Sequence, residues 1–179
     1  EAHLWKFMRL RPGNFPTIRI SQLAALIQHS EGLFSKMMEA EDFDTLKALF
    51  RVKASEYWDT HYRFNKPSAR KQTKELGKSA IETLIINTVI PFLFVYGEKQ
   101  NRHHLKDRAL DFLEKLPPEN NAITRKWESL GVKARSAFET QALIGLKNSF
   151  CDQKKCLNCQ IGNKLVKTIP DTTHGPTAK

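Results

Sequence analysis

Apolar residues recur along this chain at the three- and four-residue spacing that is typical of amphipathic helices. The pattern predicts a helix over residues 18–30, a short helix after Gly32 and a third helix over residues 42–51. A long central helix is expected over residues 76–96, where Pro91 should kink it because proline lacks the backbone donor of a helix interior. Further helices are predicted near residues 105–116, 123–130, 134–150 and 161–166.

The first predicted helix carries one apolar stripe, made of Ile20, Leu23, Ala24 and Ile27. An aromatic-rich connection follows the third helix, over residues 57–64, and leads into a loop at Lys66-Pro67-Ser68. No pair of strands and no internal repeat is evident. The pattern therefore predicts an all-α fold, a single-domain helical array that ends in a C-terminal cysteine loop.

The helical domain is expected to cover residues 1–169, with the cysteine loop at 150–162 and a flexible tail at 170–179. A chain of 179 residues is long enough for one domain with a sizeable core. It starts at Glu1 without an initiator Met or a basic-then-apolar leader. We therefore expect no signal peptide, and we expect a fragment of a longer protein.

The longest apolar run, over residues 84–96, is interrupted by Asn87, Thr88 and Pro91 and falls short of the ~20 residues that a membrane-spanning helix needs. We interpret it as a buried central helix and expect no membrane contact. The three cysteines lie close together rather than spread in pairs along the chain, which favours a reducing, cytoplasmic location over a secreted disulfide framework.

Positive charge is concentrated in two stretches of a chain whose formal net charge is +10. The first stretch, residues 61–79, sums to +5, because only Glu75 opposes six cations: Arg63, Lys66, Arg70, Lys71, Lys74 and Lys78. The second begins at Lys147 and includes Lys154 and Lys155. These eight cations are candidate contacts for DNA or RNA phosphates. The alternative is a solvated surface that merely happens to be basic.

Lys74 and Lys78 are the strongest candidates among these cations. The predicted helix places them one turn apart at its start, where the helix dipole also favours anions. An ordinary solvated first turn would explain the same pattern.

Cys151, Cys156 and Cys159 have the spacing C-x4-C-x2-C, which can place three thiolates around one metal. A structural zinc site and a four-iron cluster each normally take four ligands, so one ligand is missing. His174, His61, His103 and His104 are candidates for it, and so is a part of the protein outside this chain. Zinc, an iron–sulfur cluster and three thiols without metal are all compatible with the spacing.

Three blocks of the chain, residues 9–26, 76–91 and 150–162, resemble the C-terminal half of an uncharacterised bacterial family, domain-of-unknown-function family 2851. The resemblance implies a further N-terminal region and brings no established activity. The cysteine segment is also similar to the iron–sulfur loop of helix-hairpin-helix DNA glycosylases, although residues 160–165 lack the fourth cysteine of that loop.

These observations lead to one main hypothesis, a nucleic-acid-binding helical domain with a C-terminal metal or iron–sulfur site. The first alternative is a structural or protein-interaction domain without metal, whose basic segments dock an acidic partner or the missing N-terminal region. A glycosylase-like enzyme is the second alternative, and no catalytic constellation can be named for it from the residues.

Overall fold

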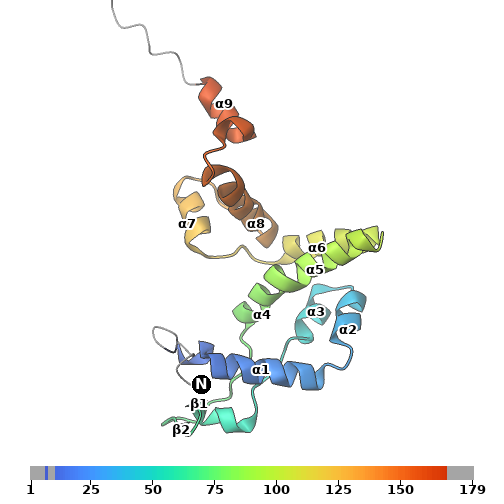
Figure 1. The fold of residues 1–179 in the computed structure, drawn as a ribbon, viewed down its shortest axis with the longest axis vertical. Helices are drawn as coiled ribbons and strands as arrows, with labels where there is room; N and C mark the ends of the chain where they lie inside the picture. The colour runs from blue at the N-terminus through green and yellow to red at the C-terminus, as the bar shows by residue number, and fades with distance from the viewer. Residues whose placement is uncertain (1–6, 8–10, 169–179) are drawn as a thin grey trace, which may run out of the picture. The chain divides into compact units, whose positions relative to one another are not determined.

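A computed structural model describes Phe7 and residues 11–168 of the chain (Figure 1). The described part is mostly helical, with a single two-stranded sheet, so the predicted helical fold class is confirmed. The chain divides into two compact units, an N-terminal unit of Glu1–Leu113 and a C-terminal unit of Glu114–Lys179. The expected tail at 170–179 lies outside the described residues, and the expected domain limits stay a prediction.

The described residues of the N-terminal unit form five α-helices and most of a sixth. They are α1 (Pro16–His29), α2 (Leu33–Glu39), α3 (Phe43–Ala48), α4 (Lys78–Leu84), α5 (Ile90–Lys99) and α6 (His103–Lys115). Short 3-10 turns span Pro12–Asn14 and Glu56–Asp59. Asp42 caps α3 by accepting a hydrogen bond from the Thr45 backbone, and the hydrogen bond from the Thr45 side chain holds the pKa of this carboxyl below its ordinary value.

The predicted central helix is continuous from Lys78 to Lys99, because a π turn at Ile85–Val89 joins α4 to α5. Pro91 is the second residue after this turn, and the wider i→i+5 hydrogen bonds of a π turn are one way in which a helix accommodates an irregularity. The helix continues to Lys99, past the end at residue 96 that the sequence predicts. Gly97 is buried, and a Cβ there would lie 3.0 Å from the Arg102 carbonyl oxygen, so the chain entering α6 packs closely against it.

Six side chains of this central helix are buried in the core: Ile81, Ile85, Ile86, Val89, Ile90 and Leu93. By length and composition Lys78–Lys99 could also cross a membrane, and it is the one such helix within the described residues. A single helix of this kind is weak support for a membrane span, because core helices of soluble proteins meet the same criteria.

Helix α1 turns a different face inward from the stripe that the sequence suggests. Ile20, Leu23 and Ile27 are exposed, whereas Ile18, Gln22 and Leu26 are buried together with Thr17. Two of the buried side chains are polar and are hydrogen-bonded. Thr17 Oγ1 donates to the Tyr62 carbonyl at 2.7 Å, and Gln22 Nε2 donates to the Lys74 carbonyl at 3.1 Å. Hydrogen-bond partners far along the chain therefore decide which face of α1 is buried. The spacing of apolar residues within α1 cannot predict such partners.

A small β-hairpin replaces the loop that the sequence suggests after the aromatic-rich connection. Strands β1 (His61–Arg63) and β2 (Lys66–Pro67) pair antiparallel around the two-residue turn Phe64-Asn65. Asn65 has a φ of 55°, and asparagine tolerates this left-handed conformation better than most residues. In the sequence, Asn65 between short polar and aromatic segments is the feature that could have predicted this turn.

The C-terminal unit contains α7 (Ala122–Ser129), α8 (Ala137–Leu146) and α9 (Gln160–Thr168). A capping box at Asn121 and Thr124 begins α7, and Ser136 caps α8. Trp127 Nε1 donates to the Leu143 carbonyl at 3.2 Å and fastens α7 to α8. A π turn at Lys147–Cys151 extends α8, and a 3-10 turn at Cys156–Asn158 precedes α9.

The orientation of α1 can be tested with two substitutions of one residue type on one helix. Ile18 is fully buried and Ile27 is 68% exposed. We expect Ile18→Ala to lower the free energy of unfolding by about 2–5 kcal/mol, because it leaves a cavity in the core. Ile27→Ala should change it by less than about 0.5 kcal/mol. Urea denaturation of both variants checks this, and equal effects would contradict the orientation of α1.

Candidate nucleic-acid interface

The segment of residues 61–71, which we call the cationic hairpin, contains four cations and no acidic residue. Strands β1 and β2 place Arg63 directly opposite Lys66. Like charges directly opposite each other destabilise a pair of strands, so this pairing does not serve the stability of the hairpin. The hairpin is held instead by Ser68, whose backbone N–H donates to the Thr60 carbonyl at 2.7 Å and whose side chain donates to the same oxygen.

Three cations of the hairpin, Lys66, Arg70 and Lys71, are exposed. Within Phe7 and residues 11–168, their side chains have no hydrogen-bond acceptor and no carboxylate partner. Arg63 differs, because its guanidinium lies over the rings of Phe7 and Phe15, 4.3 and 5.5 Å from their centroids. Cation–π contacts orient an arginine without neutralising its charge, so all four cations can still attract an anion.

Aromatic rings gather at the turn of the hairpin and form what we call the tip cluster: Tyr57, Trp58, His61 and Phe64. His61 stacks on Tyr57 with ring centroids 4.1 Å apart, and Phe64 meets the Trp58 ring edge-on at 5.1 Å. Tyr57 Oη accepts a hydrogen bond from the Asn65 backbone N–H at 3.1 Å. The turn is therefore anchored to rings beneath it, while 69% of Phe64 and 42% of Tyr57 stay exposed.

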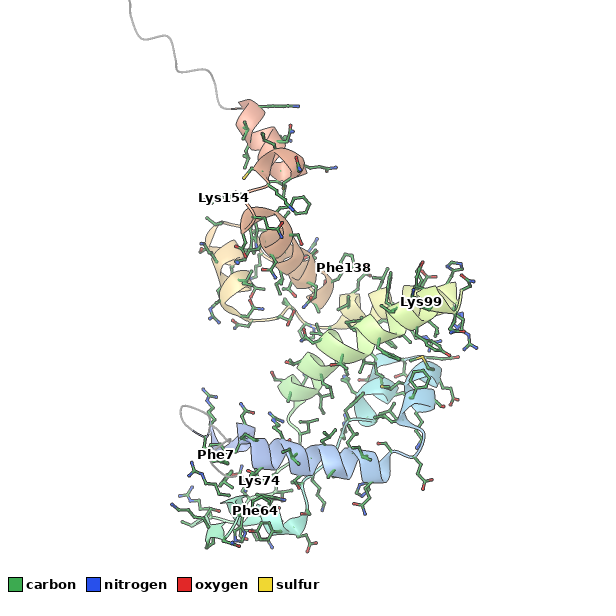
Figure 2. All side chains as sticks on the ribbon, in the orientation of Figure 1. Phe7, Phe64, Lys74, Lys99, Phe138 and Lys154 are labelled. Carbon is green, nitrogen blue, oxygen red and sulfur yellow. The ribbon has the colours of Figure 1, made fainter. Side chains whose placement is uncertain are left out.

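Lys74 does not lie on the surface with the other cations, and it is not on the helix that the sequence suggested. The central helix begins at Lys78, and Lys74 is buried with only 5% exposed. Lys74 is labelled in Figure 2. Its Nζ donates to the Gln72 carbonyl at 2.7 Å and the Asp59 carbonyl at 3.2 Å, and it lies 4.2 Å from the Tyr62 ring centroid. The ammonium group is thus used inside the fold and is not free for a phosphate.

Lys78 is the first residue of α4, and its side chain is 81% exposed. Its Nζ lies 3.9 Å from Glu82 Oε1, one turn along the helix. Such an exposed pair contributes little to stability, so Lys78 is accessible to another anion.

The three cysteines lie in the C-terminal unit on the turns that lead into α9. Cys151 and Cys156 are exposed and Cys159 is half-buried, and all three are free thiols. Among the described residues, no group of three or more His, Cys, Asp or Glu side chains is placed to hold one metal ion. In this geometry the residues do not fit a structural zinc or four-iron site, so the metal site stays a prediction from the sequence.

The histidines named for this site belong to the N-terminal unit or lie outside the described residues, whereas Lys154 and Lys155 belong to the same unit as the thiols. His103 and His104 are exposed at the start of α6, and His61 Nδ1 is within hydrogen-bond distance of the Tyr57 carbonyl, 2.9 Å away. His174 lies outside the described residues. Lys154 and Lys155 are exposed beside the cysteines, and Lys154 has a left-handed φ of 54°.

The cysteine turn is held tightly against α9. A Cβ at Gly162 would lie 2.5 Å from the Cys156 carbonyl oxygen, so this contact requires glycine. Asn163 Nδ2 donates to the Leu157 carbonyl at 3.1 Å, and the Asn163 backbone N–H donates to the Cys159 carbonyl at 2.8 Å. These contacts connect the cysteine turn to the first residues of α9.

A groove of about 800 Å³ in the N-terminal unit was not suggested by the sequence. It lies between α1 and the bridged segments at residues 51–56 and 75–76. Arg51 and Lys53 share its lining with Glu56 and Glu75. Charges of both signs line this groove, whereas the cationic hairpin carries only one sign, so the hairpin is the better candidate for a polyanion.

The structural role of Lys74 predicts an effect on stability that an exposed hairpin lysine should not have. Lys74→Met leaves the Asp59 and Gln72 carbonyls without their donor, and we expect a loss of about 1–3 kcal/mol in the free energy of unfolding. Lys71→Met, the matched change at an exposed lysine of the hairpin, should stay within about 0.5 kcal/mol. Thermal and urea denaturation would measure both, and an undiminished stability of the Lys74 variant would contradict its role in the fold.

The placement of the cysteines predicts their reactivity in the native protein. We expect a thiol-reactive disulfide reagent to modify Cys151 and Cys156 rapidly and Cys159 more slowly, in the order of their exposure. A strong chelator added beforehand should leave these rates unchanged. Thiols that react only after chelation, with zinc or iron released into solution, would instead support the metal prediction. Protein purified without air, treated with a reducing agent and then freed of it before the reagent is added, is the control for prior oxidation.

Comparisons with known proteins agree with the family resemblance and add no activity. No curated protein matches the chain, and no solved structure matches it. These comparisons do not support the similarity of the cysteine segment to DNA glycosylases. One family model, described as a protein of unknown function (DUF2851), matches residues 1–122. This match ends before the cysteine segment, so the resemblance of residues 150–162 and the assignment to the C-terminal half of the family stay predictions. Because the match spans more than half of the chain, the chain belongs to the DUF2851 family of proteins of unknown function.

Proposed function

We propose that the N-terminal unit binds nucleic acid through the cationic hairpin. One observation carries this proposal: Arg63 and Lys66 lie directly opposite each other, with Arg70 and Lys71 following, and the segment has no acidic residue. Bringing like charges together costs free energy unless an anion offsets the repulsion. A row of phosphates provides such an anion, and the release of its counterions adds a further driving force.

The contrast with Lys74 supports this interpretation. Of the five cations in residues 61–74, Lys74 alone is buried, and its ammonium group helps hold the loop that follows the hairpin. The other four do not serve the fold through ion pairs within the described residues. Their common property is an exposed charge on a short, anchored element, which suits an external anion.

The hairpin also joins its cations to aromatic rings. Phe64 lies in the two-residue turn between Arg63 and Lys66. The rings of Tyr57 and His61 lie near Phe64 in the tip cluster. Basic side chains interleaved with exposed rings are typical of surfaces that contact both the backbone and the bases of a nucleic acid. An acidic protein partner would account for the cations of the hairpin but not for its exposed aromatic rings.

A protein-interaction role is the second candidate, and an observation in the C-terminal unit favours it. Leu157, Ile161 and Leu165 recur at four-residue spacing along the cysteine turn and α9, and each is more than half exposed. Lys164 and Lys167 lie on the same helix. A basic helix with an exposed apolar stripe is a feature of surfaces that dock a partner helix or groove. This role could coexist with nucleic-acid binding by the other unit.

Binding to fluorescently labelled DNA and RNA oligonucleotides at a series of salt concentrations tests the proposal. With about four phosphate contacts, the affinity should fall by about 50- to 150-fold between 50 and 200 mM salt. Lys66→Ala and Lys71→Ala should each weaken binding similarly for every sequence and reduce the slope of log K against log salt by about 0.7–0.9.

Lys99→Ala is the matched control, because Lys99 is an exposed lysine of the same unit at the C-terminal end of α5, far from Phe64 (Figure 2). It should leave both the affinity and the salt slope nearly unchanged. An absence of binding at low salt would overturn the proposal and leave the protein-interaction role as the better candidate. Equal effects of the control and the hairpin variants would show that net charge, and not the hairpin, attracts the oligonucleotide.

A further inference from the structure

We infer that the cationic hairpin takes single-stranded nucleic acid and stacks an unpaired base on Phe64. This inference rests on the proposed function, because it names the class of nucleic acid bound at the same site. It is carried by the placement of one ring: Phe64 lies at the turn between two cations, it is 69% exposed, and its inner edge is fixed by other rings.

The Phe64 ring is supported by neighbouring rings in spite of its exposure. The Trp58 ring meets it at 5.1 Å with an interplanar angle of 69°, and the Tyr57 ring lies 6.3 Å away. Trp58 is itself buried in a small core with Ile18 and Ala54. This series of contacts, from the core through Trp58 to Phe64, restricts the exposed ring. Stacking of a base on Phe64 therefore costs little free energy for ordering the side chain.

The turn itself does not require a large apolar residue at this position. Asn65 supplies the left-handed backbone conformation, and its N–H is satisfied by Tyr57 Oη. A polar residue at position 64 would serve a two-residue turn and avoid exposing about two thirds of a phenylalanine to water. An exposed aromatic ring in isolation needs no explanation, but here two cations flank it across a strand pair.

The charges lie where a stacked base would bring its phosphates. A nucleotide has a phosphate on either side of its sugar, and Arg63 and Lys66 precede and follow the turn that carries Phe64. Arg70 and Lys71 continue the positive charge along the chain beyond β2. A single strand could therefore place a base on the ring and its neighbouring phosphates near cations on both sides.

An intact duplex fits the tip cluster less well. Bases in a duplex are stacked on one another, so a protein ring reaches their faces only by wedging between two base pairs and unstacking them. That costs a few kcal/mol per step, and proteins offset the cost with wide surfaces that wrap the bent duplex. The hairpin is short, with strands of three and two residues. The same stacking chemistry applies to DNA and RNA, and the experiment compares both.

Fluorescence anisotropy with four labelled probes of about ten nucleotides tests the inference. The probes are oligothymidylate, oligouridylate, an abasic strand of the same phosphate number, and a duplex that contains the thymidylate strand. At low salt we expect both base-containing single strands to bind at least about fivefold more tightly than the abasic strand, because stacking of one base contributes about 1–3 kcal/mol. The duplex should bind less tightly than either single strand.

Phe64→Leu separates stacking from charge, because leucine keeps the apolar character and loses the flat ring. We expect this variant to lose the preference for base-containing strands and to bind the abasic strand as the unchanged protein does. Phe64→Trp should keep the preference. Phe138→Leu is the matched control, since Phe138 is also a partly exposed phenylalanine, at 40%, and belongs to the C-terminal unit (Figure 2). Circular dichroism verifies that each variant is folded.

The outcomes distinguish the inference from the proposed function. Equal affinity for the abasic and base-containing strands, with normal salt dependence, would overturn base stacking and leave phosphate binding intact. Tighter binding of the duplex than of the single strands would overturn the preference for single strands. No binding of any probe would overturn the proposed function itself. An unchanged preference in Phe64→Leu would show that another ring takes the base.

Discussion

The N-terminal unit depends on one buried cation, Lys74, and on the backbone around it. Its ammonium group donates to the carbonyls of Asp59 and Gln72, while its own carbonyl accepts from Ala54 N–H and Gln22 Nε2. One residue thus joins α1, the segment before the hairpin and the segment after it. A buried charge is costly unless its donors are satisfied, so these partners stabilise the unit when they are in place together.

The contacts around Lys74 also position the hairpin. Tyr62 packs under the Lys74 ammonium group, its carbonyl accepts from Thr17, and its ring meets Phe15 edge-on at 6.2 Å. The inner side of the hairpin is therefore fixed by contacts with α1 and the core, whereas its turn and the side chains of Lys66, Arg70 and Lys71 stay exposed. A cationic surface on a well-anchored element can bind without first paying for its own ordering. Phosphate binding and base stacking are proposals that follow from this placement.

The C-terminal unit presents a different kind of surface. Its cysteine turn packs on Gly162 and is tied to Asn163, so Leu157 continues the apolar stripe of α9 beyond the helix itself. Membership of the DUF2851 family rests on residues 1–122 and leaves this turn without a family assignment. The three thiols share a short segment but not a common centre in the described structure. Proximity in sequence does not by itself supply the geometry of a metal site.

Local pattern in the sequence determined the helical class, the approximate helices and the segment where charge is concentrated, because periodicity, proline and charge are properties of short stretches. It did not determine which face of α1 is buried, since Gln22 and Thr17 find their partners about 50 residues away. It also grouped Lys74 with Lys66 and Lys71, although only the tertiary structure separates a cation held by carbonyls from cations left to solvent. Burial and hydrogen-bond partners arise from contacts between distant segments, and these decided which predicted residues remain available to a ligand.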